Sequence, residues 1–324
     1  MKIAVTGGCG FIGSNFVKIL ASEKASKHEI IIADKLSYAA DLSYIKPLLK
    51  SKQTTFKQVD ISDSKQTTVF LKKTRPDVIV HFAAETHVDN SIKTPTPFIY
   101  TNVVGTFNLL EAASIFKVKK FIHISTDEVY GFIKPNEDRE FKETDILEPS
   151  SVYSSTKAAS DLIALSYYKT YGLNTVVTRC CNNFGPNQHK EKFIPTIIKS
   201  ILNKRPIPVY GNGTNVREWI YVKDHCKHVL NVLENGIPGE IYNIGSNTSF
   251  TNIELVKQIG DYMAKKYNLQ YHIKYVTDRK GHDFKYAIDN TKLSKVSKYK
   301  PLTSFTSNLQ STIDWYYDIL KKTS

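Results

Sequence analysis

Two adjacent acids, Asp127 and Glu128, follow Thr126 at the end of an apolar run, residues 120–124, that predicts a buried strand. Acids at such a position have two interpretations. They can cap the helix that follows, or they can serve as a general acid and a general base. Adjacent carboxyl groups suit acid–base work because repulsion separates their titrations, so that one is neutral while its neighbour is charged.

A glycine-rich stretch, VTGGCGFIGSN, follows the first predicted strand and begins a helix. Gly7, Gly10 and Gly13 form a GxxGxxG pattern, and Gly8 with the last two also fits GxGxxG. Such glycines allow a tight turn and let backbone N–H groups approach a pyrophosphate at the helix N-terminus. No Gly-Lys-Ser/Thr follows, so the loop is not a Walker A motif. The pattern predicts a dinucleotide site.

An acid at the end of the second predicted strand indicates which dinucleotide binds. Asp34 ends the run IIIAD, about twenty residues after the glycines, where a carboxylate accepts hydrogen bonds from the adenosine ribose and repels a 2′-phosphate. NAD is therefore favoured over NADP, although Lys35 weakens the preference slightly. The alternative is a tight turn with a helix cap.

Tyr153 and Lys157 lie four residues apart at the start of a predicted helix, hence on one face. A phenol with a pKa of about 10 is a poor base at neutral pH, but a nearby ammonium and a nicotinamide cation both favour the phenolate. Lowering the pKa of the phenol by three units takes about 4 kcal/mol. Taken alone, the Y-x-x-x-K spacing is common and indicates little.

Alternating strand and helix patterns must position these residues. They predict an α/β fold, a Rossmann-type doubly wound parallel sheet covered on both faces. The first domain should span residues 1–178, with a smaller substrate-binding lobe over 179–324 and a segment near 215–245 that returns to the first domain. The predicted strands are 3–6, 30–33, 55–58, 78–82, 121–125 and 175–179, and the predicted helices include 13–22, 98–116 and 156–171.

Composition excludes several classes of function. The 324 residues carry a net charge of +13, but only six of the 44 basic residues are arginine, so a solvated lysine-rich surface is favoured over nucleic-acid binding. No apolar run approaches a membrane span, and the four cysteines show no disulfide or zinc spacing. A soluble cytoplasmic protein without a metal is expected. His225, Cys226 and His228 are expected on a helix surface.

Motifs in order along nearly the whole chain resemble the extended short-chain dehydrogenase/reductase superfamily, specifically its nucleoside-diphosphate-glucose 4,6-dehydratases. They are TGGCGFIGSN, DKLSYA, HFAAETHVDNS, STDEVYG, YSSTKA, RCCNNFGPNQ, EKFIP and GHDFKYAID. Most of these motifs are shared with sugar-nucleotide epimerases and decarboxylases. The Thr-Asp-Glu run is the part that separates the dehydratases from them.

The resemblance implies a mechanism. Tyr153 takes the proton of the glucosyl 4-hydroxyl as NAD accepts hydride from C4, with Thr126 hydrogen-bonded to the reacting oxygen. Glu128 then removes the C5 proton, protonated Asp127 donates to the departing 6-hydroxyl, and hydride returns to C6. The product is a 4-keto-6-deoxy sugar nucleotide, an early intermediate of rhamnose or other deoxysugar synthesis.

The resemblance also implies two sets of binding residues. The NAD set is Gly7, Gly10, Phe11, Ile12, Gly13, Asp34, Lys35, Asp60, Ile61, Ala83, Ala84, Thr101, Tyr153, Lys157 and Asn183. The sugar-nucleotide set is Thr86, Thr126, Asn182, Lys192, Pro208, Tyr210, Arg217, Asn252, Arg279 and His282. Arg217 and Arg279 are candidate diphosphate ligands, with surface salt bridges as the alternative.

Three questions stay open at this point. The rival functions are a 4-epimerase or decarboxylase on the same scaffold and a non-catalytic NAD- or nucleic-acid-binding protein. UDP-glucose and dTDP-glucose are both candidate substrates, because Asn187 and Gln188 stand where many bacterial dTDP-glucose enzymes have Tyr-His. A homodimer is expected through the two long helices, with Phe107, Leu110, Leu162, Leu165 and Tyr168 as candidate apolar contacts.

Overall fold

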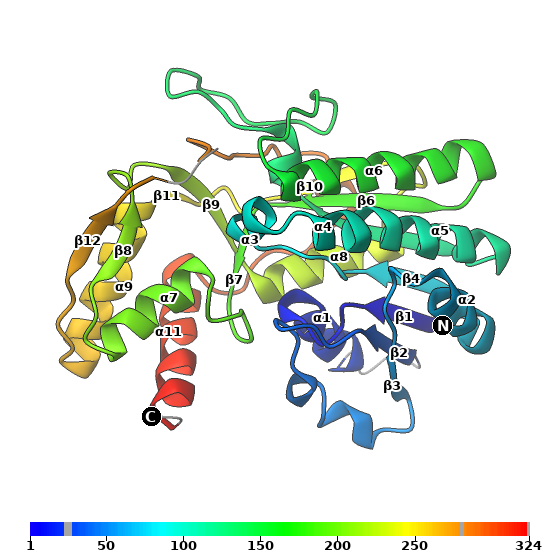
Figure 1. The fold of residues 1–324 in the computed structure, drawn as a ribbon, viewed down its shortest axis with the longest axis horizontal. Coiled ribbons are helices and arrows are strands. Elements are labelled where there is room, and N and C mark those ends of the chain that lie inside the picture. The colour runs from blue at the N-terminus through cyan, green and yellow to red at the C-terminus, as the bar shows by residue number, and fades with distance from the viewer. Residues whose placement is uncertain (23–27, 279–281, 323–324) are drawn as a thin grey trace.

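A seven-stranded sheet forms the larger part of the protein, in a computed structural model that describes residues 1–22, 28–278 and 282–322 (Figure 1). The strand order is β10-β6-β5-β4-β1-β2-β3, and every pairing is parallel. The strands are β1 (Lys2–Thr6), β2 (Glu29–Asp34), β3 (Thr54–Gln58), β4 (Val78–His81), β5 (Lys120–Thr126), β6 (Thr175–Cys180) and β10 (Ile241–Ile244). The predicted doubly wound sheet and its six predicted strands are confirmed.

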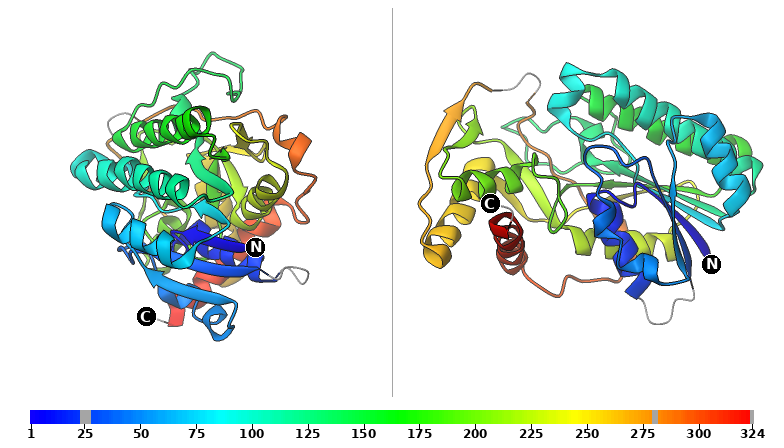
Figure 2. Two further views of the ribbon diagram at one scale, coloured as in Figure 1. Left: turned by 90° about the vertical axis from the view of Figure 1, so that its right-hand side faces the viewer. Right: turned by 60° about the horizontal axis from the view of Figure 1, so that its bottom comes forward.

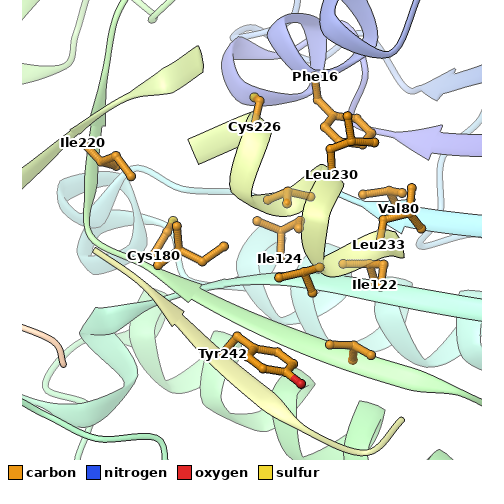
Figure 3. Packing of buried hydrophobic residues seen from close by; sticks show 14 of the residues in the cluster. Phe16, Val80, Ile122, Ile124, Cys180, Ile220, Cys226, Leu230, Leu233 and Tyr242 are labelled. Atoms are coloured by element: carbon orange, nitrogen blue, oxygen red, sulfur yellow. The ribbon is translucent and has the colours of Figure 1, made fainter. Parts of the chain in front are cut away.

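Helices cover both faces of this sheet (Figures 1 and 2). On one face α1 (Phe11–Ser22) and α8 (Val222–Asn235) pack against each other and the strands, and Figure 3 shows Phe16 and Leu230 meeting there. The other face carries α2 (Ser64–Thr74), α5 (Gly105–Ile115) and α6 (Val152–Tyr171). Strands that are apolar on both sides require this double cover.

The predicted single helix over residues 98–116 is wrong in one respect. It consists of α4 (Thr96–Phe98), a π-helical stretch η3 (Ile99–Val104) and α5. The π-helical stretch contains Asn102. Its side-chain amide exchanges hydrogen bonds with the backbone of Glu85 and also donates to Thr156. Insertions of this kind frequently occur at functional sites.

A second lobe lies beside the carboxyl edge of the sheet (Figure 1). It contains a three-stranded sheet of order β11-β9-β7 and a two-stranded sheet of β12 and β8. Its elements are β7 (Asn182–Phe184), α7 (Phe193–Leu202), β8 (Ile207–Tyr210), β9 (Val216–Tyr221), β11 (Ser249–Thr251), α9 (Asn252–Tyr267), β12 (Ile273–Val276) and α11 (Phe305–Lys322). A separate apolar core joins α7, α9 and α11.

The segment 215–245 is divided between the two parts of the molecule. Strand β9 pairs with β7 and β11 in the second lobe, whereas α8 packs on α1 and β10 pairs with β6 at the edge of the large sheet. The short elements complete the described chain: η1 (Leu42–Tyr44), η2 (Leu48–Lys50), α3 (Val88–Lys93), η4 (Asp127–Tyr130) and α10 (Leu293–Val296). Within the described ranges, no helix has the length and apolar character needed to cross a bilayer.

Candidate active site

A cavity opens at the carboxyl ends of β1, β2, β4 and β5, where a doubly wound sheet binds its ligands. It contains all five predicted catalytic residues: Thr126, Asp127, Glu128, Tyr153 and Lys157. Predicted NAD residues that line it are Gly7, Gly10, Phe11, Ile12, Gly13, Asp34, Lys35, Ile61, Ala83, Ala84, Thr101 and Asn183. Asp60 lies in an adjoining depression beside Lys35.

The glycine loop leaves no room for side chains. Gly7 has φ +68°, and a Cβ atom there would lie 2.6 Å from the backbone nitrogen of Ala83. A Cβ on Gly13 would lie 2.2 Å from the carbonyl oxygen of Gly7. The glycines therefore hold β1, α1 and the end of β4 close together and keep an open cradle at the N-terminus of α1, as a pyrophosphate requires.

Asp34 is fixed by the loops around it. Its Oδ2 accepts a hydrogen bond from the backbone N–H of Cys9 at 3.0 Å, and its Oδ1 accepts from Leu36 at 2.8 Å. Burial raises the pKa of Asp34, while these two bonds oppose the rise. The neighbouring Lys35 forms an ion pair with Glu85 at 3.0 Å, which neutralises the cation beside the acid.

Tyr153 and Lys157 project from the first turns of α6, which a capping box of Ser151 and Ser154 begins. The Nζ of Lys157 donates to the Ile124 carbonyl at 2.8 Å, and burial lowers the pKa of Lys157 to about 8. Burial raises the pKa of Tyr153 well above its ordinary value, and nearby acids add to the rise. A hydrogen bond with Thr126 lowers the pKa of Tyr153 by less than burial raises it, so the lowering expected from the lysine does not decide its direction.

Thr126 organises the acidic pair. Its Oγ1 accepts from the backbone N–H of Glu128 at 3.2 Å, caps η4, and donates to Oδ1 of Asp127 at 3.1 Å. Asp127 is 2% exposed, and burial raises its pKa well above the ordinary value, with Glu128 and Glu218 adding to the rise. Its Oδ2 has no hydrogen-bond partner among the described residues. Burial therefore favours the neutral form of the Asp127 carboxyl, and Thr126 caps η4.

The predicted sugar-nucleotide residues divide into two groups. Thr86, Thr126, Asn182 and Lys192 line the cavity. Outside its lining, in the second lobe, lie Pro208 and Tyr210 on β8, Arg217 on β9, Asn252 at the start of α9, and His282. Arg279 lies outside the described residues.

Arg217 is buried, with 5% of its surface exposed. Its guanidinium donates to the carbonyl groups of Val216, Asp283 and Phe284 and lies 4.4 Å from the centre of the Tyr286 ring. The surface salt bridge that was the alternative interpretation therefore does not describe this side chain.

Several residues outside the two predicted binding sets also line the cavity. Gln188 and Glu191 line the cavity, whereas the side chain of Asn187 is buried and donates to Ser14 at 3.1 Å on α1. The remaining lining residues are Ala33, Ser37, Ala39, Ala40, Val59, Phe82, Ile124, Ser125, Cys180, Cys181 and His189. Their shared signal is position, because they lie in the last residues of strands, just after strand ends or in the loop before α7.

The expected surface position of His225, Cys226 and His228 is wrong. All three are buried because that face of α8 packs on the large sheet and the loops beside it. His225 bonds to Asn183 at 2.8 Å and His228 to Ser297 at 2.8 Å. The four cysteines are buried free thiols, and across the described ranges no three or more His, Cys, Asp or Glu residues gather as a metal site.

The glycine cradle, Asp34 at the end of β2 and the Tyr153–Lys157 pair on α6 surround one cavity, an arrangement typical of nicotinamide-dependent enzymes of the extended short-chain dehydrogenase/reductase class. The sequence profile described as GDP-mannose 4,6 dehydratase matches residues 4–312. The chain belongs to this family.

Two relatives illustrate the similarity in sequence. A dTDP-glucose 4,6-dehydratase of Streptomyces niveus is 41% identical, with 98% of this chain and 93% of that protein covered. The low-salt glycan biosynthesis protein Agl12 of Haloferax volcanii is 44% identical, with 98% of each chain covered. Similarity therefore extends over both the sheet and the second lobe.

Solved structures show the same fold. The dTDP-glucose 4,6-dehydratase DesIV of Streptomyces venezuelae, crystallised with NAD and TYD, has a TM-score of 0.92 at 42% identity, with 98% of this chain and 97% of that one covered. A UDP-glucose 4-epimerase of Thermus thermophilus with NAD has a TM-score of 0.87 at 26% identity, with 98% of this chain and 99% of that one covered. The fold alone does not separate the two activities, so the site must.

Proposed function

We propose that this protein is an NAD-dependent dehydratase that converts a nucleoside-diphosphate glucose to its 4-keto-6-deoxy product, a step towards rhamnose or another deoxysugar. The observation that carries the proposal is the pair Asp127 and Glu128, which faces the same cavity as Tyr153 and Lys157. An epimerase needs no acid–base pair at this position, because it only removes and returns a hydride. Eliminating water needs both a base and a proton donor.

NAD fits the glycine cradle and Asp34, and when bound it supplies the reversible hydride acceptor that the reaction needs. Tyr153 is the base for the 4-hydroxyl proton, with Thr126 hydrogen-bonded to the same oxygen. Glu128 is the base for the C5 proton, which a 4-ketone makes acidic. Asp127 protonates the departing 6-hydroxyl, a task for which its burial keeps it neutral.

The two parts of the chain divide the binding of ligands in this proposal. Residues 1–178 hold NAD, and most of 179–324 holds the nucleotide sugar, with α8 and β10 belonging to the first domain. Thr86, Asn182 and Lys192 contact the sugar nucleotide within the cavity. The second-lobe residues Tyr210 and His282, whose rings lie 6.0 Å apart, contact its nucleotide end.

Thymidine diphosphate glucose is the first substrate to test. Several relatives at 40–41% identity are dTDP-glucose 4,6-dehydratases. Of the two residues that suggested a uracil nucleotide, Asn187 donates to Ser14 within the protein and does not line the cavity, whereas Gln188 does line it. UDP-glucose stays the second candidate.

Incubation with dTDP-glucose and with UDP-glucose separately tests the activity. Mass spectrometry should show a product lighter by one water from one of them. A 4-epimer of unchanged mass would contradict the dehydratase proposal, and no reaction with either sugar would contradict the substrate class.

A homodimer with a cytoplasmic location is also proposed. Figures 1 and 2 show α5 and α6 side by side on one face of the molecule, where they carry exposed Phe107, Leu162 and Tyr168. Leu110, predicted as a contact, is fully buried in the domain core, and Leu165 packs against that core. Exposed Ile99, Tyr100, Ile115 and Tyr171 extend the apolar surface.

A further inference from the structure

Two loops from different parts of the chain meet over the cofactor end of the cavity. The hydroxyl of Tyr38, in the loop after β2, donates to Oε1 of Glu191, in the loop between β7 and α7, at 2.9 Å. Glu191 lines the cavity that also contains Asp34. Ser37, next to Tyr38, lines it as well, whereas Tyr38 itself does not. We call the Tyr38–Glu191 contact the loop bridge.

Other side chains hold the loop bridge in place. The His189 Nδ1 lies 3.4 Å from Oε1 of Glu191, and the His189 ring meets the edge of the Tyr38 ring at 5.4 Å. The His87 Nε2 lies 3.9 Å from the other carboxylate oxygen. The amide of Asn90 donates to the Tyr38 hydroxyl at 3.5 Å. Among these contacts the Tyr38 hydroxyl is the hydrogen-bond donor to the carboxylate, and two histidine rings from both parts of the molecule lie close to it.

The residue after Glu191 makes a parallel contact. The Nζ of Lys192 donates to the Thr86 carbonyl at 2.8 Å, which joins the same two parts of the chain. Lys192 and Thr86 line the cavity and belong to the proposed substrate site. Tyr38 stands apart from them, because its only role visible in these contacts is to hold Glu191.

We propose that Tyr38 is a positioning residue that holds Glu191 across the cavity and so retains NAD between turnovers. The inference rests on the NAD site of the proposed function. A dehydratase that returns its hydride within each turnover gains nothing from releasing the cofactor, and slow opening of the two loops keeps it bound. A phenol donating to a carboxylate is a charge-assisted bond, which resists opening more than a neutral one.

Tyr38→Phe tests the proposal, because it removes the donor and keeps the ring beside His189. Protein loaded with NAD is diluted into an enzymatic trap for free NAD, and the nucleotide still bound is measured after denaturation. We expect Tyr38→Phe to release NAD about tenfold faster than the natural protein, the size expected for one hydrogen bond to a charged group. Its kcat at saturating NAD should stay within about twofold of the natural value.

Two further variants make the test specific. Tyr275→Phe removes a hydroxyl of similar exposure, 57% against 53%, on β12 at the outer edge of the second lobe, and should release NAD at the natural rate (Figure 1). Glu191→Leu removes the acceptor and should release NAD faster, and the double variant with Tyr38→Phe should release it no faster than Glu191→Leu alone.

Three outcomes would overturn the proposal. They are natural NAD retention in Tyr38→Phe, a double variant whose effect is the product of the two single effects, and a kcat that stays low at saturating NAD. Release is measured without turnover, so a protein that retains NAD but does not dehydrate sugar nucleotides would contradict only the proposed function. A protein that binds no NAD would contradict both.

Discussion

Glu128 and Tyr153 serve different steps of the proposed reaction, so their replacement should separate those steps. Glu128→Gln keeps size and hydrogen bonding but removes the base, and turnover should fall by about 10² to 10⁴. Oxidation at C4 should survive, so enzyme-bound reduced nicotinamide should accumulate and solvent deuterium should no longer enter C5. Tyr153→Phe should block oxidation and show no reduced cofactor. Normal turnover of Glu128→Gln would reject its role as the C5 base.

The charge on Lys157 predicts the alkaline limit of activity. Burial lowers the pKa of Lys157 to about 8, so the ammonium that supports the Tyr153 phenolate is lost as the pH rises through that value. We expect kcat/KM, measured from about pH 6 to pH 10, to fall on the alkaline side. Lys157→Arg keeps its charge throughout this range, so whatever activity it retains should lack that fall. The same alkaline limb in both proteins would assign it to another group.

At the scale of elements, the turn between β1 and α1 tolerates a side chain at some of its glycines far less than at others. A Cβ atom on Gly13 would lie 2.2 Å from the Gly7 carbonyl, whereas one on Gly10 would lie 3.3 Å from the same oxygen. Gly13→Ala should therefore lower the free energy of unfolding by about 1 to 3 kcal/mol, as overpacking does. Gly10→Ala should cost clearly less in the same urea titration. Equal losses would show that the turn adjusts to either side chain.

The elements also show what the sequence could and could not predict. The strands and the glycine loop were predictable because their signals are local, as in the apolar run that ends at Asp34. The π-helical turns of η3 were not, and Asn102 within them is hydrogen-bonded to Glu85 and Thr156, 17 and 54 residues away, contacts that no local pattern reports. Glu191 was missed for the same reason: only the packing of the second lobe brings its loop to the cavity.

For the whole molecule, the apolar surface of α5 and α6 predicts how copies associate. Leu162 is 59% exposed on α6, and a charge there would be buried unpaired in a dimer that uses this surface. Leu162→Glu should therefore be a monomer by light scattering at micromolar concentration, while the natural protein is a dimer. Leu302→Glu, at a site 90% exposed in the loop before α11, should leave the dimer intact. A monomeric natural protein would reject the proposed assembly.

Acid should destabilise the whole fold through four buried histidines. Burial lowers the pKa of His123 to about 4, of His225 to about 3 and of His228 to about 4, and lowers that of His81 well below 6.5. Below about pH 6.5 the unfolded chain binds protons at these positions and the folded chain does not. The free energy of unfolding should therefore be greatest above that pH and fall as the pH drops towards 4.

The slope of that fall identifies the groups responsible. Each histidine that is protonated only in the unfolded chain contributes about 1.4 kcal/mol per pH unit, so four give at most about 5.5 kcal/mol per unit. Urea unfolding at about pH 7.5, 6.5 and 5.5 would measure it. His228→Gln keeps a partner for Ser297 but does not titrate. The slope of its free energy of unfolding against pH should therefore be shallower by about 1.4 kcal/mol per pH unit. An unchanged slope would mean that His228 is protonated equally in both states and that other groups cause the acid sensitivity.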